Sequence, residues 1–456
     1  MQRYKPYPNY KSTSCSWLEK VPGHWSVMRL KNVATCNDDA LDEQTDPDYE
    51  IEYVDISSVS LSKGIEQSEK LLFEKAPSRA RRKVKDGDVI VSTVRTYLKA
   101  IAPINHPADN MIVSTGFAVI RPMSNLHSGY AGYLLQSNGF VGDVVARSVG
   151  VSYPAINASD LVRIPAVEPP LAEQQTIARF LDHKTAQIDT LIAKKQALLE
   201  KLAEKRSALI SHAVTKGLDP TVPMKDSGVA WLGEIPAHWG TTRIKFVAKV
   251  GNGSTPSREN ADYWFDGHFP WLNSSVVNQE SVFEADQFVT DLALKECHLP
   301  IVTPPAVLVG ITGQGKTRGM ASKLEITATI NQHLVFVKPR DDGFNVDYLR
   351  FLFDMAYSFL RNESDGGGST KGAITCEQIE NLAVPFPPIA DQAAIALHVQ
   401  SEVDALIRMQ AKIAAVIDRL QEYRSALITN AVTGKIDVRG FKLPEAADQP
   451  MQKEVA

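Results

Sequence analysis

Hydrophobic residues recur every seven positions along two long stretches of the chain, 172–215 and 390–433, that contain neither glycine nor proline. A Pro-Pro pair, Pro169-Pro170 or Pro387-Pro388, precedes each stretch. Proline is tolerated at the start of a helix but not inside one. Each stretch therefore predicts a helix of roughly 40 residues, or about 60 Å at 1.5 Å per residue.

The heptad pattern predicts that the two helices pair along one seam. The second helix carries Val399, Leu406, Ile413, Leu420 and Leu427 at intervals of seven, with Val403 and Ile417 at the alternate position. The first helix has the same register 218 positions earlier, with Leu181, Ile188, Lys195, Leu202 and Leu209, and with Ile192 and Leu199 alternating. A sustained seam needs a partner helix, and the other copy in the same chain is the simplest partner. Two ordinary core helices are the alternative, but the length and the charge-rich outer face favour a coiled coil.

Outside the helices, short apolar runs alternate with glycine and proline, which predicts mainly β or α+β globules. The fold class that we expect is α+β, with two pseudo-symmetric globular domains joined by two long helices in an antiparallel coiled coil. The expected boundaries are a first domain at 1–170, a central helix at 171–216, a second domain at 217–388, a C-terminal helix at 389–434 and a tail at 435–456.

The two halves of the chain are copies of one unit. WLEKVPGHW at 17–25 matches WLGEIPAHW at 231–239, and RSALISHAVT at 206–215 matches RSALITNAVT at 424–433. His24 and His238 lie in the first of these boxes, and we interpret both as structural residues rather than catalytic ones. If the helices are antiparallel, the globules are related by a pseudo-two-fold axis, as are the two strands of a DNA duplex.

Polar loops at matching positions in the two copies are the candidate DNA contacts. The first follows the apolar run that ends at Ser92, and the second follows Gly310. Donors and acceptors on such loops can pair with base edges in the major groove. The candidates are Thr93, Arg95, Thr96, Tyr97 and Lys99 in the first copy and Thr312, Gln314, Lys316, Thr317 and Arg318 in the second.

A second pair of candidates comes before the helical part of each unit. These residues are Ser152 and Tyr153 in the first copy and Ser369, Thr370 and Lys371 in the second, where a run of three glycines precedes them. The segment 252–257 and the basic run from Arg79 to Lys85 are further candidates. For each of these segments a solvated turn or edge is the competing interpretation.

Residues 310–317, GITGQGKT, match the phosphate-binding loop pattern and offer an ATPase as an alternative function. That loop requires a helix to begin at its Gly-Lys-Thr end, so that amide groups face the phosphates. Gly319 follows at once, and then β-branched residues alternate, which predicts a turn into another strand. The counterpart in the first copy has no such pattern, so we expect no nucleotide site.

Composition limits the other possibilities. The net charge of −4 requires that any DNA-binding surface be local or shared with a partner. The cysteines, Cys15, Cys36, Cys297 and Cys376, lack zinc-ligand spacing, and the histidines form no ligand pattern, so we expect no metal site. No segment resembles a signal peptide or a membrane span, which favours a cytoplasmic protein without membrane contact.

The chain resembles the specificity subunit of type I restriction-modification enzymes. The resemblance is carried by the WLGEIPAHW box, by the PP(L/I)AxQ entry to each helix, by the RSALIxxAVT ending, and by the link GLDPTVPMKDSGVAWLGEIP at 217–236. It implies that each globule recognises one half of an asymmetric bipartite site in double-stranded DNA, and that the helices set the spacer and dock the methyltransferase subunits, of which two are expected.

The resemblance also implies a subunit without catalysis of its own. Restriction-translocase subunits would join through the methyltransferase, and S-adenosylmethionine, ATP and magnesium would bind only to the partner subunits. No catalytic constellation in the sequence argues otherwise. An adaptor that binds only protein through its coiled coil is the remaining alternative.

Overall fold

A computed structural model of the chain describes residues 4–15, 17–313, 315–340, 343–365 and 372–443. It divides into two compact units that cut across both long helices. The first unit contains residues 1–196 and 415–456, and the second contains residues 197–414. Each unit therefore combines one globule with the first part of one long helix and the last part of the other.

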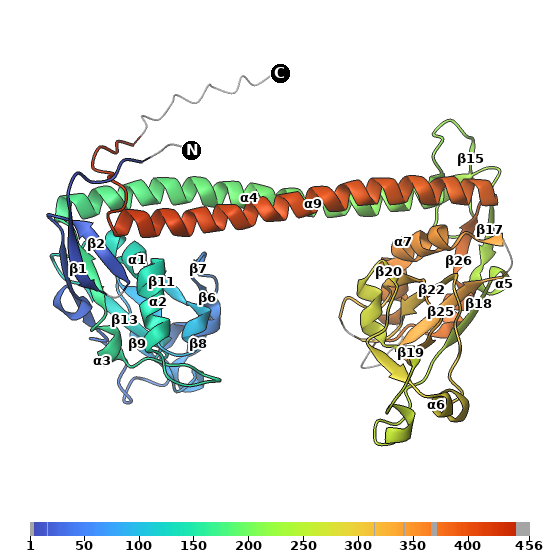
Figure 1. Cartoon of the computed structure of the whole chain (residues 1–456), viewed down its shortest axis with the longest axis horizontal. Helices are drawn as coiled ribbons and strands as arrows, with labels where there is room; N and C mark the ends of the chain where they lie inside the picture. Colours follow the sequence, from blue (N-terminus) through green and yellow to red (C-terminus); the bar gives the residue numbers. More distant parts are fainter. Residues whose placement is uncertain (1–3, 16, 314, 341–342, 366–371, 444–456) are drawn as a thin grey trace. The chain divides into compact units, whose positions relative to one another are not determined.

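The first globule consists of short strands with a few helices at its end (Figure 1). Its strands are β1 (Tyr10–Cys15), β2 (Leu18–Pro22), β3 (Ser26–Arg29), β4 (Ala34–Cys36), β5 (Glu50–Val54), β6 (Val59–Ser60), β7 (Gly64–Ile65), β8 (Glu69–Leu72), β9 (Ala80–Lys83), β10 (Val89–Ser92), β11 (Ile101–Pro103), β12 (Met111–Ser114), β13 (Phe117–Pro122) and β14 (Pro165–Glu168). Its α-helices are α1 (Ser128–Gln136), α2 (Asn138–Arg147) and α3 (Ala158–Leu161), and its 3-10 turns are η1 (Leu30–Asn32), η2 (Ile56–Ser58), η3 (Phe73–Lys75) and η4 (Thr96–Leu98).

The second globule has the same general make-up. Its strands are β15 (Met224–Asp226), β16 (Glu234–Pro236), β17 (Gly240–Arg243), β18 (Ala248–Asn252), β19 (Phe269–Leu272), β20 (Ser281–Val282), β21 (Gln287–Val289), β22 (Ala306–Gly310), β23 (Ala321–Leu324), β24 (Thr329–Ile330), β25 (Leu334–Pro339) and β26 (Ala383–Phe386). Its helical elements are α5 (Ile244–Val247), η5 (Ala261–Tyr263), η6 (Ser274–Asn278), α6 (Asp291–Glu296), α7 (Val346–Asp365) and α8 (Cys376–Asn381).

The sheets repeat in the two globules. The order β10-β13-β4 in the first corresponds to β22-β25-β18 in the second, and all of these pairs are antiparallel. Each globule also has a parallel pair, β5 with β12 and β19 with β24. Apolar strands such as VIVS and AVLVG are buried throughout, which explains why they are continuous apolar runs rather than alternating ones. The prediction of an α+β fold is confirmed.

The two long helices are α4 (Leu171–Lys216) and α9 (Ile389–Val432). In the first unit the first part of α4 packs with the last part of α9, where Arg424 Nε donates to Asp189 Oδ1 at 2.9 Å. In the second unit Ile210 of α4 shares a core with Val399 of α9. Pairing of the start of one helix with the end of the other makes the coiled coil antiparallel, as predicted.

All of the predicted seam side chains are buried or half-buried. Those on α4 are Ile188, Ile192, Leu199, Leu202 and Leu209, and those on α9 are Val399, Leu406, Ile413, Ile417, Leu420 and Leu427. The charged positions between them face outward, so each helix has one apolar side.

A buried glutamine fixes the start of each long helix to its own globule. Gln174 accepts from the backbone N–H of His127 at 2.8 Å and donates to the carbonyl groups of Asn125 and Pro169. Gln392 makes the same three bonds, to Asn345, Gly343 and Pro387. The PP(L/I)AxQ motif is thus an anchor, because its amide satisfies three backbone groups that burial removes from water.

The matched tryptophan boxes hold the ends of the helices. His24 lies 2.8 Å from Glu173 in the first turn of α4, and His238 lies 3.1 Å from Asp391 in the first turn of α9. Each histidine thus links its tryptophan box to the first turn of a long helix. Gly434, with a φ of 70°, follows α9 and packs against Pro22 and Trp25, which leave no room for a Cβ atom.

Candidate nucleic-acid interface

In both units the same backbone bridge joins the first predicted loop to residues that follow the second predicted segment in the sequence. In the first unit Val94 pairs with Ala155, and the N–H of Ile156 donates to the carbonyl of Thr93 at 2.9 Å. In the second unit Thr312 pairs with Ala373, and Ile374 donates to Ile311 at 2.8 Å. Every member of the second set lies 218 positions after its counterpart. The bridge therefore belongs to the duplicated fold, while the side chains around it differ.

In the first unit the bridged segments gather basic and aromatic side chains. The guanidinium of Arg95 lies 4.9 Å from the centre of the Tyr153 ring, and both side chains are exposed. Lys99 and Tyr97 are exposed at the other end of the loop, and Ser152 is exposed beside Tyr153. A guanidinium stacked on an aromatic ring is held with its donors directed outward, which suits contact with base edges or phosphates.

The loop backbone between Ser92 and Ala100 is strained. Arg95 and Lys99, at the two ends of η4, have φ values of 51° and 52°. Residues other than glycine pay a steric cost in this left-handed region, and such residues concentrate at binding and catalytic sites. The strain falls on the two basic residues of the loop, which is an independent reason to regard it as functional.

Thr96 has a different position from its neighbours. Its side chain is 2% exposed, and its hydroxyl donates to Ser148 Oγ at 2.8 Å. The expectation that Thr96 contacts DNA does not fit this conformation, because the hydroxyl is bonded inside the globule. Thr93 is half-buried, and its hydroxyl donates to the carbonyl of Gly116 at 2.9 Å. These two threonines support the loop, and Arg95, Tyr97 and Lys99 form its surface.

In the second unit, α7 holds the backbone of the loop 312–318. The hydroxyl of Tyr357 donates to the carbonyl of Lys316 at 2.9 Å, and Arg361 Nη1 donates to the carbonyl of Gly315 at 2.7 Å. The side chain of Lys316 is exposed and that of Thr317 is half-buried. Binding of the backbone by α7 fixes the loop while leaving the lysine free to meet a ligand.

Arg318 is the second correction among the predicted contacts. Its side chain is almost fully buried, and Nη2 donates to Asp365 Oδ1 at 2.6 Å. A Cβ atom at Gly372 would overlap the Arg318 guanidinium, so the arginine also packs closely against Gly372. It does not present its donors to a duplex. Gln314, Ser369, Thr370 and Lys371 lie outside the described residues.

The phosphate-binding loop pattern does not produce a phosphate-binding loop. Residues after Gly315 form a turn in which the N–H of Gly319 returns to the carbonyl of Gly310 at 2.7 Å. β23 then begins at Ala321 and pairs antiparallel with β22. A hairpin occupies the place where nucleotide binding needs the start of a helix, as the alternation after Gly319 predicted.

The second unit contains a polar network that was not predicted from the sequence. Thr312 Oγ1 lies 2.7 Å from His333 Nδ1, His333 lies 3.3 Å from the Gln332 amide, and Thr255 bonds Gln332. This network joins the candidate segment 252–257 to the loop 312–318. The turn that carries Gln332 and His333 links β24 to β25, and its counterpart carries Thr115 in the first unit. Only the duplication, followed turn by turn, could have indicated it.

The basic run after Arg79 is mostly paired with acids. Arg79 Nη2 lies 2.7 Å from Asp55, and Lys83 and Lys85 lie 3.7 Å from Asp39. Burial raises the pKa of the Asp55 carboxyl, but hydrogen bonds from Tyr53 and Ser57 and the charge of Arg79 outweigh this effect and hold that pKa below its usual value. The carbonyl of Arg79 accepts from Thr115, which places this ion pair next to the bridged loop.

Comparison with known proteins settles the family. The family model described as the type I restriction modification DNA specificity domain matches residues 22–201 and 236–419, one match in each repeat. The chain belongs to the family of type I restriction-modification specificity subunits. A relative in this family, the EcoKI specificity subunit of Escherichia coli K12, is 33% identical over 332 residues, or 70% of this chain and 68% of the relative.

Three further comparisons cover almost the full length of the proteins compared. A Methanocaldococcus jannaschii protein, named for the specificity subunit of the MjaX type I restriction enzyme, is 23% identical over 96% of this chain and 99% of its own. A solved structure from a study of type I R-M complex assembly has a TM-score of 0.71 at 22% identity, and covers 91% of this chain and 99% of its own. The HsdS subunit from Thermoanaerobacter tengcongensis has a TM-score of 0.50 at 21% identity, and covers 91% of this chain and 98% of its own. The specificity-subunit fold is therefore shared along the repeats.

The described residues also bear on metal binding and membrane insertion. Within the described ranges, His, Cys, Asp and Glu residues form no group of three or more that could hold a metal ion. None of the helices in the described part of the chain is long and apolar enough to cross a membrane.

Proposed function

We propose that this specificity subunit recognises a bipartite sequence in double-stranded DNA, with one half-site contacted by each globule. The observation that carries the proposal is the repeated bridge, Val94 with Ala155 and Thr312 with Ala373. It places polar loops of different sequence on the same scaffold in both units. Two different surfaces at one structural position are what recognition of two different half-sites requires.

The chain has a net charge of −4, although DNA binding requires positive charge. The basic groups at these loops supply such charge locally. Arg95 and Lys99 in the first unit and Lys316 in the second are exposed, and none forms an ion pair among the described residues. Local positive charge of this kind can neutralise phosphates even when the whole chain is acidic. Partner subunits would supply the rest of the electrostatic attraction.

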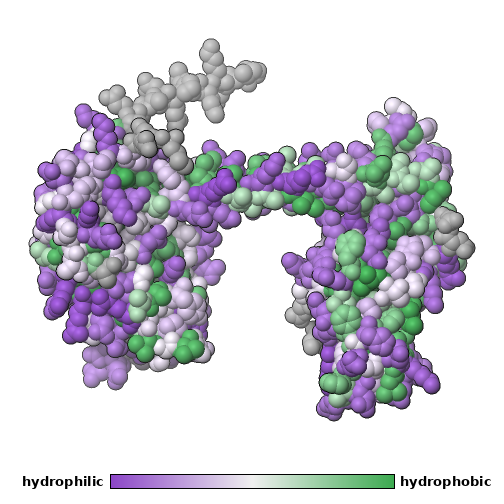
Figure 2. Space-filling model, viewed as in Figure 1, coloured by the Kyte–Doolittle hydropathy of each residue, from purple (hydrophilic) through white to green (hydrophobic). Residues whose placement is uncertain are grey.

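We assign the paired helices two roles, a fixed spacer between the half-sites and a docking surface for methyltransferase subunits. Hydrophobic and hydrophilic residues are interspersed along the outside of α4 and α9 (Figure 2). Leu397 of α9 is 76% exposed and Met409 is 49% exposed. Apolar side chains left on the outer face of a coiled coil support contact with another protein. Restriction-translocase subunits would join through the methyltransferase.

In this proposal the subunit has no catalytic activity of its own and acts in the cytoplasm. S-adenosylmethionine, ATP and magnesium would bind to the partner subunits. The hairpin at residues 315–321 supports this assignment, since the one nucleotide-binding pattern that we found in the sequence folds without its helix.

Mapping methylated adenines tests the proposal directly. The chain would be expressed with its methyltransferase subunit in a bacterial strain whose DNA lacks adenine methylation. We expect methylation at a single asymmetric sequence with two specified parts and a fixed gap. Replacing residues 93–99 should change one part only, and replacing 312–318 should change the other. Methylation without sequence preference, or assembly without DNA retention, would instead support a protein-binding adaptor.

A further inference from the structure

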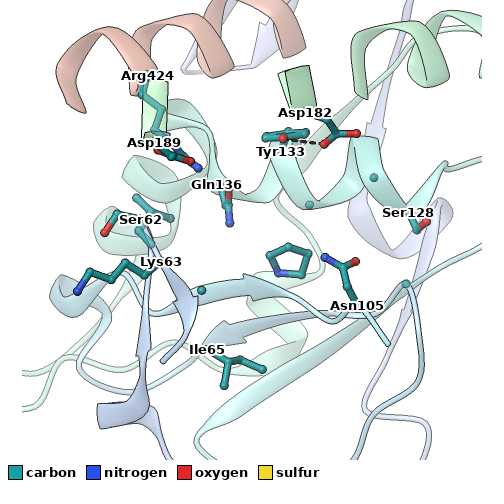
Figure 3. Close-up of a pocket in the computed structure, with 16 residues that line it drawn as sticks. Ser62, Lys63, Ile65, Asn105, Ser128, Tyr133, Gln136, Asp182, Asp189 and Arg424 are labelled. Atoms are coloured by element: carbon teal, nitrogen blue, oxygen red, sulfur yellow. Dashed lines mark hydrogen bonds and ion pairs between the residues drawn. The ribbon is translucent and has the colours of Figure 1, made fainter. Parts of the chain in front are cut away.

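A hollow of about 580 Å³ lies in the first unit where the globule meets the long helices. Its walls come from the β6–β7 hairpin, from β11 and α1, and from α4 and α9, and its lining includes glycine at positions 64, 87, 129 and 132. Figure 3 shows Tyr133 and Gln136 on the α1 side of this hollow, with Lys63 and Ile65 across from them. The DNA-recognition loops are not needed to form it, so we treat it as a separate site.

The duplication shows what fills the equivalent place in the second unit. Tyr130 of α1 and Tyr348 of α7 are matched residues, because each donates its hydroxyl to the end of a long helix. Two positions after each tyrosine stand Gly132 and Arg350. Arg350 is 3% exposed, so its side chain occupies in the second globule the space next to the helices that Gly132 leaves open in the first.

Arg350 is held there by a carboxylate, an amide and an aromatic ring. Its Nη1 lies 3.4 Å from Asp354 Oδ2, its Nη2 donates to Gln400 Oε1 at 2.9 Å, and its guanidinium carbon lies 4.0 Å from the centre of the Phe351 ring. This is a complete guanidinium site, since planar donors meet two acceptors and a ring face.

The first unit retains the same set of groups, with the acid and the amide exchanged. Gln136 of α1 corresponds to Asp354 of α7. Asp182 of α4 corresponds to Gln400 of α9. Both matches have the offset of 218 that relates the two tyrosines. The position of Phe351 is Tyr133, which supplies the ring. Within this set of groups, only Arg350 has no counterpart, because Gly132 stands in its place.

The polar groups of the hollow have the bonding capacity that such a ligand needs. Gln136 is only 9% exposed, lines the hollow, and has no hydrogen-bond partner among the described residues. Asp182 accepts from the Tyr133 hydroxyl at 2.8 Å, and no described cation lies within 4.0 Å of its carboxylate. The cations at the rim are already paired, Arg424 with Asp189 at 2.9 Å and Lys63 with Glu66 at 3.1 Å. The Gln136 amide therefore faces the hollow with its acceptor free, and an entering donor can bond to it.

We propose that this hollow binds an arginine side chain presented by a methyltransferase subunit. The identification of the partner rests on the proposed function, because the hollow is bounded by the two helices to which we assign docking. A phosphate is disfavoured, since Asp182 and the Gln136 carbonyl are acceptors. A lysine would fit less well, because a point charge cannot place parallel donors on two separated acceptors.

The first test uses an isolated arginine side chain. N-acetyl-arginine methylamide and N-acetyl-lysine methylamide are titrated onto the full chain, and binding is followed by calorimetry. A fragment of this size should bind with a Kd on the order of 1 mM, with the lysine compound at least tenfold weaker. Gly132→Arg should fill the hollow and abolish binding, as Arg350 does in the second unit. Gly132→Ala, the matched control, should retain it.

Asp182→Asn should weaken probe binding about tenfold, because the charge is lost while the bond from Tyr133 can be kept. Asp418→Asn, an exposed aspartate of α9, is its control and should have no effect. Equal binding of both probes, or equal binding to the wild type and Gly132→Arg, overturns the arginine site.

The second test asks whether the methyltransferase supplies the arginine. Affinity of the chain for its methyltransferase subunit is measured for the same variants. Gly132→Arg and Asp182→Asn should each weaken assembly at least fivefold, while Gly132→Ala and Asp418→Asn should not. Probe binding with unchanged assembly overturns the assignment of the partner. Sequence-specific methylation by the assembled complex reports the proposed function separately, so the failure of either idea is visible by itself.

Discussion

The hydroxyl of Tyr130 donates a hydrogen bond to the carbonyl of Val432, the last residue of α9, at 3.2 Å and across 302 positions of sequence. Tyr348 makes the matching bond to Val214 near the end of α4, at 2.9 Å. The globule of each repeat thus binds the end of the helix that belongs to the other repeat. This exchange explains why the compact units divide both helices.

The first prediction concerns these tyrosines. Tyr130→Phe should destabilise the end of α9, and Tyr348→Phe the end of α4, each by about 1–2 kcal/mol, because a buried carbonyl loses its donor. Amide hydrogen exchange should become roughly 5–30 times faster at that helix end. Faster hydrogen exchange at the end of α4 in the Tyr130→Phe variant would contradict the binding of each globule to the helix of the other repeat.

The second prediction concerns the anchor at the start of each helix. Gln174→Ala should lower the free energy of unfolding by roughly 2–3 kcal/mol, because it leaves the backbone N–H of His127 buried without a partner. Gln175→Ala changes the neighbouring exposed glutamine and should have little effect. Urea unfolding followed by circular dichroism measures both. Similar losses in the two variants would mean that helix propensity, and not the anchor, is responsible.

The third prediction is a pH dependence at the segment that follows α9. Hydrogen bonds from Arg439 hold the pKa of the Asp437 carboxyl below its usual value, although partial burial opposes this. The folded chain therefore binds fewer protons than the unfolded chain near pH 4, so this contribution to stability is present above that pH and is lost as the pH falls further. Asp437→Asn should reduce the difference in stability between pH 6 and pH 3. A difference unchanged from the wild type would show that Asp437 contributes nothing.

The fourth prediction separates the two half-sites. Arg95→Ala should weaken discrimination by about 1–3 kcal/mol in the half-site of the first globule, and Lys316→Ala should affect only the other half. Binding of the assembled complex to duplexes with single base changes measures this. Lys70→Ala, which removes an exposed lysine from β8, is the control. Loss at both half-sites from one loop variant would refute separate recognition.

The fifth prediction concerns the spacer. Insertion of one heptad at matching positions of α4 and α9 preserves the seam and lengthens each helix by about 10 Å. This corresponds to roughly three base pairs of duplex at 3.4 Å each. The mapped methylation site should keep both half-sites and gain a longer gap. An unchanged gap would show that the helices do not set the spacing.

The helices and the duplication could be predicted from the sequence because both depend on local periodic patterns. The seam residues needed only the spacing of seven, and the structure buries or half-buries all of them. The fate of individual loop residues could not be predicted, since Thr96 and Arg318 have the polarity of surface residues. Their burial depends on Ser148 and Asp365, distant partners that no local pattern identifies.

The candidate DNA surface was predicted in part. Both pairs of segments were recognised separately, but the bridge from Val94 to Ala155 joins residues 61 positions apart and follows from tertiary packing. The network around His333 and the hollow beside Gly132 were not predicted. A functional role for Gly132 or His333 can be inferred only by comparison with the matching residue of the other globule.

The division of the first unit has a consequence for the order of events during synthesis. Residues 197–414 form one continuous stretch, so the second unit can close its core as soon as that stretch has left the ribosome. The first unit needs Val432 and Val438 to complete its core, although most of its residues are made first. The first globule therefore completes its core only after the second has been synthesised. Until then its helix-binding surface is exposed in the nascent chain.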